Sequence, residues 1–431
     1  GDAGLDRSVE RALTDNRDLG ASWARVKQAG ALARQAGAGW WPRVEASVGA
    51  GIQQRTMFLG DSVPEAFQEQ EIRSESYPVS VGVAYEVDLW GRVANLEAAA
   101  VADGRSLEAD SRALAVTIAA QVSESWFLLA EQQALLGLLD QQIAVAETYL
   151  ALVEARFRQG LAPALDVRQQ RQEVSRLEAQ RPLLLGRISA LRTQLAVLQG
   201  GVPGEKTSIL MPDGALPVLE PVGDLGLPSQ LLRARPDLAA ALVRVAAADH
   251  RVAVAIAERF PSLRLTGSTG FQDRELSSLF GNWVWNLAGN LVAPLFEGGR
   301  RKAAVERSRA LVEERVHQYA GAVMRAVGEV EDALSGERHH RAHLEGLEVQ
   351  LGHARATLEE AHRRYLEGLN PYLPVLTALQ AVQRAEQQVV GARRQLLSDR
   401  IQLGRALGGV WLPQRTAGAV DVPLSKQGEI R

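Results

Sequence analysis

Few side chains in this sequence are spaced for chemistry. His339 and His343 lie four residues apart with His340 between them, and on a helix this spacing can chelate a divalent metal. Histidines on exposed helical faces are common, however, and no second cluster completes a ligand shell, so we expect no metal site. The 431 residues include no cysteine, which excludes disulfides, zinc–cysteine sites, iron–sulfur clusters and thiol nucleophiles.

Carboxylates and glycines offer no better catalytic candidates. The pairs Glu313-Glu314 and Glu359-Glu360 have the chemistry of general acids and bases, but on long helices we expect solvated or pore-lining charges. Gly298-Gly299 lacks the Gly-x-x-x-x-Gly-Lys-Ser/Thr pattern of a phosphate-binding loop. We therefore expect no catalytic residues and no cofactor, in a protein that is not an enzyme.

The composition resembles that of a soluble folded protein. Lys and Arg number 48 against 51 Asp and Glu, a net charge of −3 that gives no basic excess for binding nucleic acid. Apolar residues make up 46% and charged residues 23%, which is ordinary for a folded chain. The longest apolar runs, such as Ala113–Ala120, fall far short of the roughly 18 residues of a membrane-spanning helix.

The sequence repeats itself. Trp41-Pro-Arg-Val44 matches Phe260-Pro-Ser-Leu263 at an offset of 219 residues, and Arg156-Phe-Arg-Gln-Gly-Leu161 matches Arg364-Tyr-Leu-Glu-Gly-Leu369 at an offset of 208. The matches keep the same order in both halves, so we infer an internal duplication. The predicted division is a first repeat over residues 1–219, a second over 220–412, and a C-terminal tail over 413–431.

Each repeat contains a very long helical hairpin, predicted over residues 91–199 and 300–408. No proline interrupts residues 92–159 or 300–367, so each first arm reaches roughly 100 Å at 1.5 Å per residue. Apolar residues follow a heptad-like spacing: Val305, Val312, Val316, Tyr319, Val323, Val327, Val330 and Leu334. A compact soluble domain has no room for such helices. Pro182 predicts a bend or break in the second arm of the first hairpin.

Four segments alternate apolar and polar residues, as strands with one apolar face do: 43–54, 77–88, 262–271 and 282–293. Their apolar faces are rich in valine and have aromatic residues near the ends, as the lipid-facing sides of membrane barrels do. The alternative is a soluble coiled-coil scaffold or interaction protein that carries two surface hairpins. Such a scaffold stays in solution without detergent, whereas a barrel sediments with outer membranes.

Four strands cannot close a transmembrane barrel, because the smallest use about 8. An open sheet in lipid leaves unpaired edge amides, each of which costs roughly several kcal/mol. Strands shared among identical chains remove those edges. We therefore predict a mainly α-helical chain with membrane β-structure, whose strands are shared among several copies. Three copies would give a 12-stranded β-barrel, within the range that bacterial barrels use, and the long helical hairpins would continue it as a helical barrel.

Several motifs resemble those of outer-membrane efflux channels of the TolC and OprM type, the outer membrane factor family and its NodT-like lipoprotein branch. They are Leu227-Pro-Ser-Gln-Leu-Leu-Arg-Ala-Arg-Pro-Asp-Leu238, Arg259-Phe-Pro-Ser-Leu263, Asp88-Leu-Trp-Gly-Arg92, Phe296-Glu-Gly-Gly-Arg300, Tyr365-Leu-Glu-Gly-Leu369 and Ala406-Leu-Gly-Gly-Val-Trp411. The resemblance extends over essentially the whole chain to about Leu412, and the duplication matches as well.

The resemblance implies a homotrimer in the bacterial outer membrane, with a periplasmic α-barrel and an equatorial belt over residues 1–18, 200–232 and the C-terminus. Members act as exit ducts of tripartite efflux pumps, with a periplasmic adaptor protein and an inner-membrane transporter as partners. Others are ducts for type I protein secretion, a second alternative here. Many relatives carry a lipidated N-terminal cysteine, which is absent from this chain and leaves a lipid anchor as an expectation only.

The same resemblance assigns roles at the hairpin ends. The tips that dock with the adaptor correspond to Gly160, Leu161, Ala162, Gly368, Leu369 and Asn370. The pore gate corresponds to Leu373, Thr377 and Asp166. Thr377 stands where relatives often have Asp, so we expect a weaker acidic ring and less cation preference than in typical members.

Overall fold

The computed structural model describes residues 2–58, 69–204, 212, 214, 216–220 and 234–409. Parts of three expectations lie outside the described residues. The first is most of the predicted belt segment 200–232, which includes the motif that begins at Leu227. The second is the part of the belt predicted at the chain end, from residue 410. The third is the predicted boundary at residue 412, with the tail 413–431.

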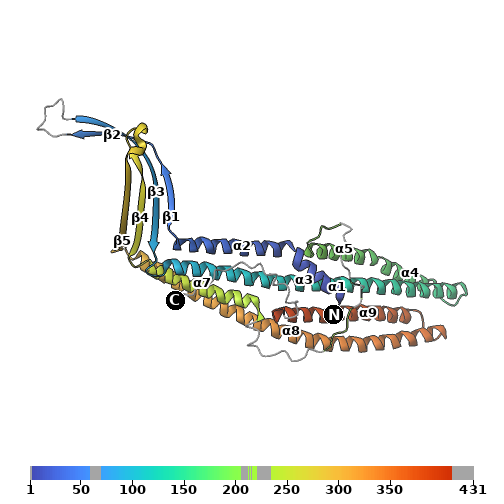
Figure 1. Ribbon diagram of the computed structural model, residues 1–431. Helices are drawn as coiled ribbons and strands as arrows, with labels where there is room; N and C mark the ends of the chain where they lie inside the picture. Colours follow the sequence, from blue (N-terminus) through green and yellow to red (C-terminus); the bar gives the residue numbers. More distant parts are fainter. Residues whose placement is uncertain are drawn as a thin grey trace. The chain divides into compact units, whose positions relative to one another are not determined.

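The chain forms two compact units. We call residues 27–106 and 241–318 the sheet unit, and residues 1–26, 107–240 and 319–431 the helical unit. Figure 1 labels the helices and strands of both. The two longest helices, α3 (Arg92–Arg158) and α8 (Arg300–Leu366), contribute residues to both units and have 67 residues each. At 1.5 Å per residue each is about 100 Å long, as the uninterrupted sequence predicts.

The sheet unit contains one antiparallel sheet in the order β1-β3-β4-β5, in which β2 also pairs with β3. The bounds are β1 Arg43–Val48, β2 Gly51–Phe58, β3 Glu69–Val87, β4 Ser262–Asp273 and β5 Trp283–Val292. A short helix, η3 (Leu276–Gly281), lies between β4 and β5. All four predicted strands are present.

Two strand boundaries were predicted incorrectly. The segment predicted as one strand over 43–54 is split at Gly49 and Ala50 into β1 and β2, and β3 begins at Glu69 rather than at residue 77. Pro78 of β3 lies opposite this split, where its carbonyl accepts a hydrogen bond from Gly49 N at 2.9 Å. Proline has no N–H to donate to the ladder, so the pairing is interrupted there and resumes at Gly51.

Four further helices and one short turn complete the first half of the chain and lead into the second. They are α1 (Ala3–Asp15), α2 (Arg17–Gly37), η1 (Ala38–Trp40), α4 (Ala164–Glu178) and α5 (Arg181–Leu198). The predicted break at Pro182 is found: α4 ends at Glu178, and the proline lies in the first turn of α5. Because the proline ring clashes with the carbonyl four residues earlier, one continuous helix cannot form.

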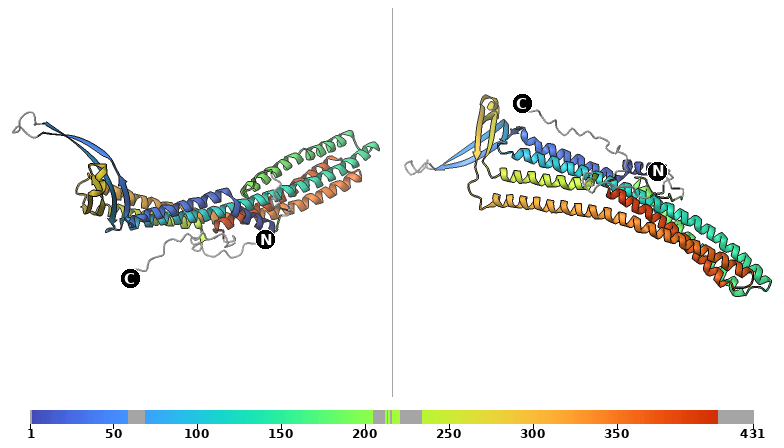
Figure 2. Two further views of the ribbon diagram at one scale, coloured as in Figure 1. Left: turned by 45° about the horizontal axis from the view of Figure 1, so that its top comes forward. Right: turned by 90° about the horizontal axis from the view of Figure 1, so that it is seen from below.

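In the second half, α7 (Pro236–Ala257) precedes β4, and α9 (Leu373–Ala406) follows α8. Figure 2 shows α3, α8 and α9 running alongside one another up to the hairpin turns. Gly160 and Gly368 make those turns with φ angles of 76° and 75°, a left-handed conformation that glycine adopts without a steric penalty.

Ion pairs and hydrogen bonds join the helices of the helical unit. Arg171 of α4 donates to Glu154 of α3 at 2.7 Å, and Arg394 of α9 pairs with Glu124 of α3. Arg393 of α9 pairs in turn with Glu348 of α8 at 2.8 Å. α9 also contacts α4 through Gln380 and Glu173, and the end of α3 contacts the end of α8 through Arg156, so the two hairpins pack together as one bundle.

The largest apolar core of the helical unit surrounds α3. It includes Val122, Trp126 and Leu129 of α3 with Leu195 of α5 and Leu397 of α9, all buried. Among the described helices, only α3 is long and apolar enough to cross a membrane by length and composition, with a mean hydropathy of 1.4 over its best window. Since 61% of that window is buried inside the chain, core packing accounts for its apolar character.

Candidate membrane surface, gate and docking tips

The register of the sheet brings apolar side chains from all four long strands to one face. This face carries Val44, Ala46, Val48, Val79, Val81, Val83, Tyr85, Val87, Leu263, Leu265, Thr269, Phe271, Trp283, Trp285, Leu287 and Leu291. The other face is mainly polar and carries Arg43, Glu45, Ser47, Ser80, Glu86, Arg264, Thr266, Ser268, Asn286 and Asn290. The alternation predicted within each strand is therefore in phase across the whole sheet.

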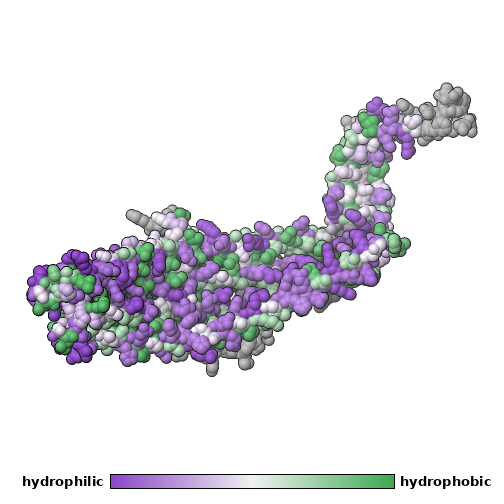
Figure 3. Space-filling model, turned by 180° about the vertical axis from the view of Figure 1, so that it is seen from behind, coloured by the Kyte–Doolittle hydropathy of each residue, from purple (hydrophilic) through white to green (hydrophobic). Residues whose placement is uncertain are grey.

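Phe280 of η3 packs edge-on against Phe271, but most of the apolar face is exposed in the described chain. Leu287 is 75% exposed, Trp285 67% and Val44 62%. In Figure 3 apolar and pale side chains gather over the strands, whereas hydrophilic ones predominate along the helices. A contiguous apolar surface of this kind is unfavourable in water and marks contact with lipid or with another protein.

The dimensions of the apolar face suit a bilayer. From Leu263 to Phe271 the strand rises about 27 Å at 3.4 Å per residue, or about 21 Å once tilted by the 40° typical of barrels. Outer-membrane barrels carry an apolar band about 25 Å tall with aromatic girdles at both interfaces. Beyond Tyr77 the same face of β3 continues with Glu75 and Arg73, so the apolar surface ends there.

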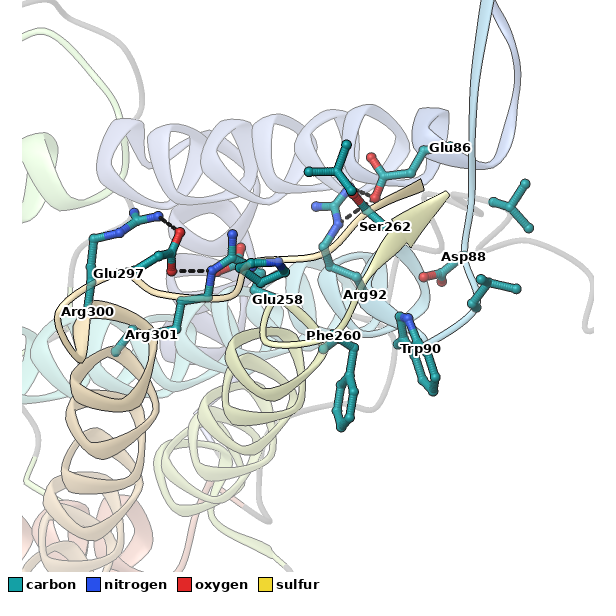
Figure 4. A pocket seen from close by; sticks show the side chains of 16 residues that line it. Glu86, Asp88, Trp90, Arg92, Glu258, Phe260, Ser262, Glu297, Arg300 and Arg301 are labelled. Carbon is teal, nitrogen blue, oxygen red and sulfur yellow. Dashed lines mark hydrogen bonds and ion pairs between the residues drawn. The ribbon is translucent and has the colours of Figure 1, made fainter. Parts of the chain in front are cut away.

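The strands join the helices at a junction rich in ion pairs, shown in Figure 4. Arg92 Nε donates to Glu86 at 2.8 Å, and Glu297 accepts from Arg301 at 2.6 Å and from Arg300 at 2.9 Å. These two hydrogen bonds lower the pKa of the Glu297 carboxyl, Arg301 having the larger effect. The cavity between the pairs measures about 550 Å³. Because the arginines already hold carboxylates, the junction is a structural turn rather than a reactive site.

The motif Asp88-Leu-Trp-Gly-Arg92 has a structural role in this junction. Asp88 accepts a hydrogen bond from Ala94 N at 2.9 Å and so satisfies a free amide at the start of α3. Trp90 stacks on Phe260 with ring centroids 4.7 Å apart and donates to the Pro261 carbonyl at 2.7 Å. Elements from both repeats are thereby joined where the strands end.

The two hairpin tips have the same construction. Gly160 N donates to the Phe157 carbonyl and Leu161 N to the Arg156 carbonyl, both at 2.9 Å. Gly368 and Leu369 repeat this pattern with the Tyr365 and Arg364 carbonyls. Leu161 is 61% exposed and Leu369 69% exposed. Each tip therefore presents one exposed leucine, directly after its glycine, on a turn fixed by backbone hydrogen bonds.

The remaining tip residues differ from these leucines. Ala162 is buried, whereas Asn370 is half-buried. Of the six residues predicted to dock, Gly160, Leu161, Gly368 and Leu369 are exposed.

Near the tips, a buried aromatic cluster packs the two hairpins against each other. Tyr372, at the start of α9, is completely buried and donates from its hydroxyl to Gln170 Oε1 of α4 at 2.6 Å. Gln170 is also completely buried and donates to the Ala146 carbonyl of α3 at 2.7 Å. Tyr365 packs edge-on against Tyr372, with Arg156 over its ring. Burial raises the pKa of the Tyr372 hydroxyl, which stays protonated.

Sequence reasoning missed Tyr372 and Gln170. A signal was present, because Gln170 lies in the apolar row of α4 between Val167 and Val174, where a polar side chain needs a partner. That signal identifies a buried glutamine but not which residue satisfies it.

The predicted gate residues occupy two different environments. Leu373 is 55% exposed on α9, and Thr377 lies one turn later, exposed, with its hydroxyl donated to the Leu373 carbonyl at 2.9 Å. Asp166 in the first turn of α4 is only 7% exposed, and burial raises the pKa of its carboxyl. Leu373 and Thr377 thus share an exposed face, while Asp166 lies inside the tip.

A second buried contact lies further from the tip. Glu173 of α4 is 2% exposed, pairs with Arg176 at 2.5 Å and accepts from Gln380 Nε2 of α9 at 2.8 Å. Burial raises the pKa of the Glu173 carboxyl, but the hydrogen bonds from Arg176 and Gln380 outweigh burial and leave that pKa below its ordinary value. The start of α9 is therefore held against α4 at two successive levels.

The histidines of α8, His339, His340 and His343, do not act as one group. His340 Nδ1 lies 2.6 Å from Asp399 Oδ2 of α9, so this ring is engaged in a contact between helices. Among the described residues, no three histidine, aspartate or glutamate side chains are grouped to hold a metal.

A sheet with one exposed apolar face, outer strands that have no outside partner among the described residues, and helices about 100 Å long defines a membrane channel built from β-strands and helical hairpins. The chain belongs to the outer membrane efflux protein family, whose model matches residues 8–201 and 227–409. It is therefore an outer-membrane protein that serves as an exit duct for efflux. The family suggested by the sequence motifs is confirmed.

Individual relatives agree along almost the whole chain. The pyoverdine export outer membrane protein OpmQ of Pseudomonas aeruginosa is 34% identical over 95% of this chain and 86% of its own. The toluene efflux pump outer membrane protein TtgF of Pseudomonas putida is 30% identical over 94% of this chain and 82% of its own. The solved outer-membrane channel OprN superposes with a TM-score of 0.87 at 28% identity, covering 96% of this chain and 91% of that one.

Proposed function

We propose that three copies of this chain form the closed duct. The observation that carries this proposal is the pair of sheet edges: within the described residues, β1 pairs only with β3 and β5 only with β4. In lipid such edges must be paired, since each free amide costs roughly several kcal/mol. β5 of one copy pairing with β1 of the next closes the barrel with twelve strands, a number within the bacterial range.

Cross-linking in membranes tests the closure. The chain has no cysteine, so a cysteine at Ala46 of β1 together with one at Leu287 of β5 reports only the intended contact. Oxidation in outer membranes yields covalent trimers if β5 meets β1 of the next copy. Monomers alone, from a protein that remains in the outer membrane, would argue against shared strands.

The hairpin tips are the docking surface for a periplasmic adaptor protein, which links the duct to an inner-membrane transporter. Support comes from the exposed Leu161 and Leu369, which two rigid turns present at equivalent positions. Gly160, Ala162, Gly368 and Asn370 shape these turns. Leu161→Asp and Leu369→Asp are expected to abolish efflux and adaptor cross-linking while the duct still folds and reaches the membrane. Full efflux in the double variant would place docking elsewhere.

The gate lies just inside the tips and is formed by Leu373, Thr377 and Asp166. Exposure of Leu373 and Thr377 on one face of α9 supports a narrow apolar ring without carboxylates at those positions. Because Asp166 is buried in the single chain, the acidic ring is weak and cation selectivity is low. Strong cation selectivity in planar bilayers that is lost in Thr377→Ala would contradict this assignment.

The cargo is proposed to be small organic molecules, since pyoverdine export and toluene efflux are named for OpmQ and TtgF. Expression in a bacterium that lacks its own outer-membrane channel, together with candidate pumps, tests the class. Restored resistance to solvents or restored siderophore release supports it. Secretion of a protein substrate without either would favour the type I duct.

A further inference from the structure

Positive charge is concentrated on the two helices that connect to the edge strands of the sheet. α8 follows the edge strand β5, and the first ten residues of α8 contain five basic side chains and one acidic side chain. α2 precedes the edge strand β1, and the last eleven residues of α2, 27–37, contain two basic side chains and no acidic one. The basic residues of α8 are Arg300, Arg301, Lys302, Arg307 and Arg309, and those of α2 are Lys27 and Arg34.

The helices that connect to the central strands β3 and β4 do not carry this charge. The first ten residues of α3 contain one basic and one acidic side chain, and so do the last ten residues of α7. α3 and α8 follow the sheet at equivalent positions in the two repeats, so the fold itself does not require the charge on α8. Basic side chains in a first helical turn also oppose the helix dipole, which is positive at that end. The charge therefore points to a negatively charged partner.

Only part of this charge is neutralised within the chain. Arg300 and Arg301 pair with Glu297, and the Lys302 ammonium lies 3.9 Å from Glu306. The other four basic side chains are exposed and form no ion pair with any residue that the structure describes: Lys27, Arg34, Arg307 and Arg309.

The height of Arg34 below the sheet follows from contacts between α2 and α3. Trp40 Nε1 donates to Glu97 Oε2 of α3 at 2.7 Å, and Gly37 lies against the same carboxylate, so α2 ends beside Glu97. α2 leads toward the sheet and α3 away from it, and Arg34 lies three residues before Gly37. At 1.5 Å per residue, Arg34 is therefore level with a point about 12 Å from the start of α3.

The unpaired arginines of α8 lie at nearly the same height. Val87 of β3 and Leu291 of β5 both lie opposite Leu263, and α3 and α8 begin five and nine residues after them. The two long helices therefore begin at similar levels below the sheet. Arg307 and Arg309 lie about 10 Å and 14 Å from the start of α8, which brackets the height of Arg34.

Exposed apolar side chains lie on the connections between these two helices and the edge strands. Trp41, before β1, is 77% exposed, and Leu295 and Phe296, after β5, are 95% and 91% exposed. These connections lie where the apolar band ends on the periplasmic side, at the level of the polar headgroups, a layer about 5–8 Å thick. Aromatic side chains favour that layer, and long basic side chains just below it reach the phosphates. The two connections thus have the composition of a phospholipid contact.

We propose that each seam between neighbouring copies holds an anionic phospholipid of the periplasmic leaflet. In the ring of copies proposed above, on which this inference rests, β5 of one copy meets β1 of the next, so α8 and α2 of neighbouring copies come together. Arg34 of one copy then faces Arg307 and Arg309 of the next, and direct contact between these like charges is repulsive. A lipid phosphate between them neutralises the repulsion, while the exposed apolar side chains of the two connections contact the glycerol and acyl chains.

Lipid retention by purified trimers tests the site. Trimers stripped of lipid in detergent are titrated with phosphatidylglycerol or, at equal concentrations, with phosphatidylcholine, and native mass spectrometry counts the bound lipids. The wild type is expected to hold about three molecules of phosphatidylglycerol and little phosphatidylcholine, one lipid for each seam. Arg34→Gln/Arg309→Gln should weaken phosphatidylglycerol binding about 25-fold, since each basic side chain near an anionic lipid contributes about fivefold.

Arg192→Gln/Arg338→Gln is the matched control, because it removes the same charge from two exposed arginines of the helical unit that form no ion pair among the described residues. The control should bind phosphatidylglycerol as the wild type does. Equal binding of the two lipids by the wild type, or an equal loss of binding in the control, would overturn the site.

Charge reversal gives an independent readout. Arg34→Glu replaces repulsion across the seam by attraction, so stripped trimers of this variant should dissociate at a higher temperature than stripped wild-type trimers. Added phosphatidylglycerol should raise the dissociation temperature of the wild type but not of Arg34→Glu. Equal stabilisation of the wild type by inorganic phosphate would refute a lipid ligand. A wild-type protein that is monomeric by light scattering refutes the ring itself, whereas a trimer without preference for phosphatidylglycerol refutes only the lipid site.

Discussion

A charged residue in the middle of the apolar face provides a quantitative test of the membrane assignment. Leu287 lies near the centre of β5, pairs with Gly267, and is 75% exposed on that face. Arginine on the lipid side of a barrel costs about 2–4 kcal/mol at the bilayer midplane. Leu287→Arg is therefore expected to lower the folding equilibrium constant by roughly 30- to 700-fold per chain.

Ala288→Arg is the matched control for this substitution. Ala288 is the next residue of β5, pairs with Thr266 and belongs to the mainly polar face. If that face lines a water-filled lumen, arginine there costs far less than on the lipid side, because its charge stays hydrated. Both variants introduce the same charged side chain, at neighbouring positions of one strand that lie on opposite faces of the sheet.

Unfolding by urea from lipid vesicles, followed by tryptophan emission, measures both variants. Trp283 and Trp285 lie on the apolar face and report its transfer from lipid to water. The reasoning predicts a much lower unfolding midpoint for Leu287→Arg than for Ala288→Arg. Equal midpoints, or a larger loss in Ala288→Arg, would refute the assignment of this face to lipid.

Three further predictions concern the helical unit. Tyr372→Phe leaves the buried Gln170 Oε1 without its donor and should cost about 1–3 kcal/mol in chemical unfolding. Tyr149→Phe, whose hydroxyl makes no hydrogen bond within the described part of the chain, should cost less, and equal losses would show that the Tyr372 hydroxyl is unimportant. The pKa of Glu173 lies below its ordinary value of 4.5, so the stability it contributes is present above about pH 4.5 and is lost as the pH falls through its folded-state pKa. Unfolding midpoints should therefore fall more steeply in acid for the wild type than for Glu173→Gln, and parallel profiles would contradict this. Gly160→Ala forces a side chain into a φ of 76° and should cost about 1 kcal/mol, while Gly137→Ala inside α3 should stabilise; differential scanning calorimetry distinguishes the two, and a stabilising Gly160→Ala would contradict the turn geometry.

The long elements could be predicted from the sequence because their patterns are local. Proline-free heptads between Arg300 and Leu366 specify one helix, and the alternation from Val79 to Val87 specifies one strand. Pro182 also marked the division between α4 and α5 correctly. In each case the residues that carry the pattern lie next to one another in the chain.

Features that depend on pairing between distant residues were not predictable in this way. The split between β1 and β2 is caused by Pro78, which is about thirty residues further on and acts only once β3 lies alongside. The burial of Asp166 and the hydrogen bond between Tyr372 and Gln170 likewise require two hairpins from different repeats to meet. A single sequence gives the side chains but does not show which of them pair in the fold.

The same distinction between local patterns and contacts between distant residues applies to the candidate sites. Glycine turns and exposed leucines at the tips follow from short motifs, so Leu161 and Leu369 were identifiable. Their contact with an adaptor and the role of Leu373, Thr377 and Asp166 as a gate stay predictions, because they are properties of an assembly.

The mass of the protein extracted from outer membranes into detergent tests the central claim most directly. One chain has a mass of 46.6 kDa, so native mass spectrometry should find an assembly of about 140 kDa, three chains that close one barrel. A folded, outer-membrane-derived protein of 46.6 kDa would contradict the account, since four strands cannot close a barrel by themselves.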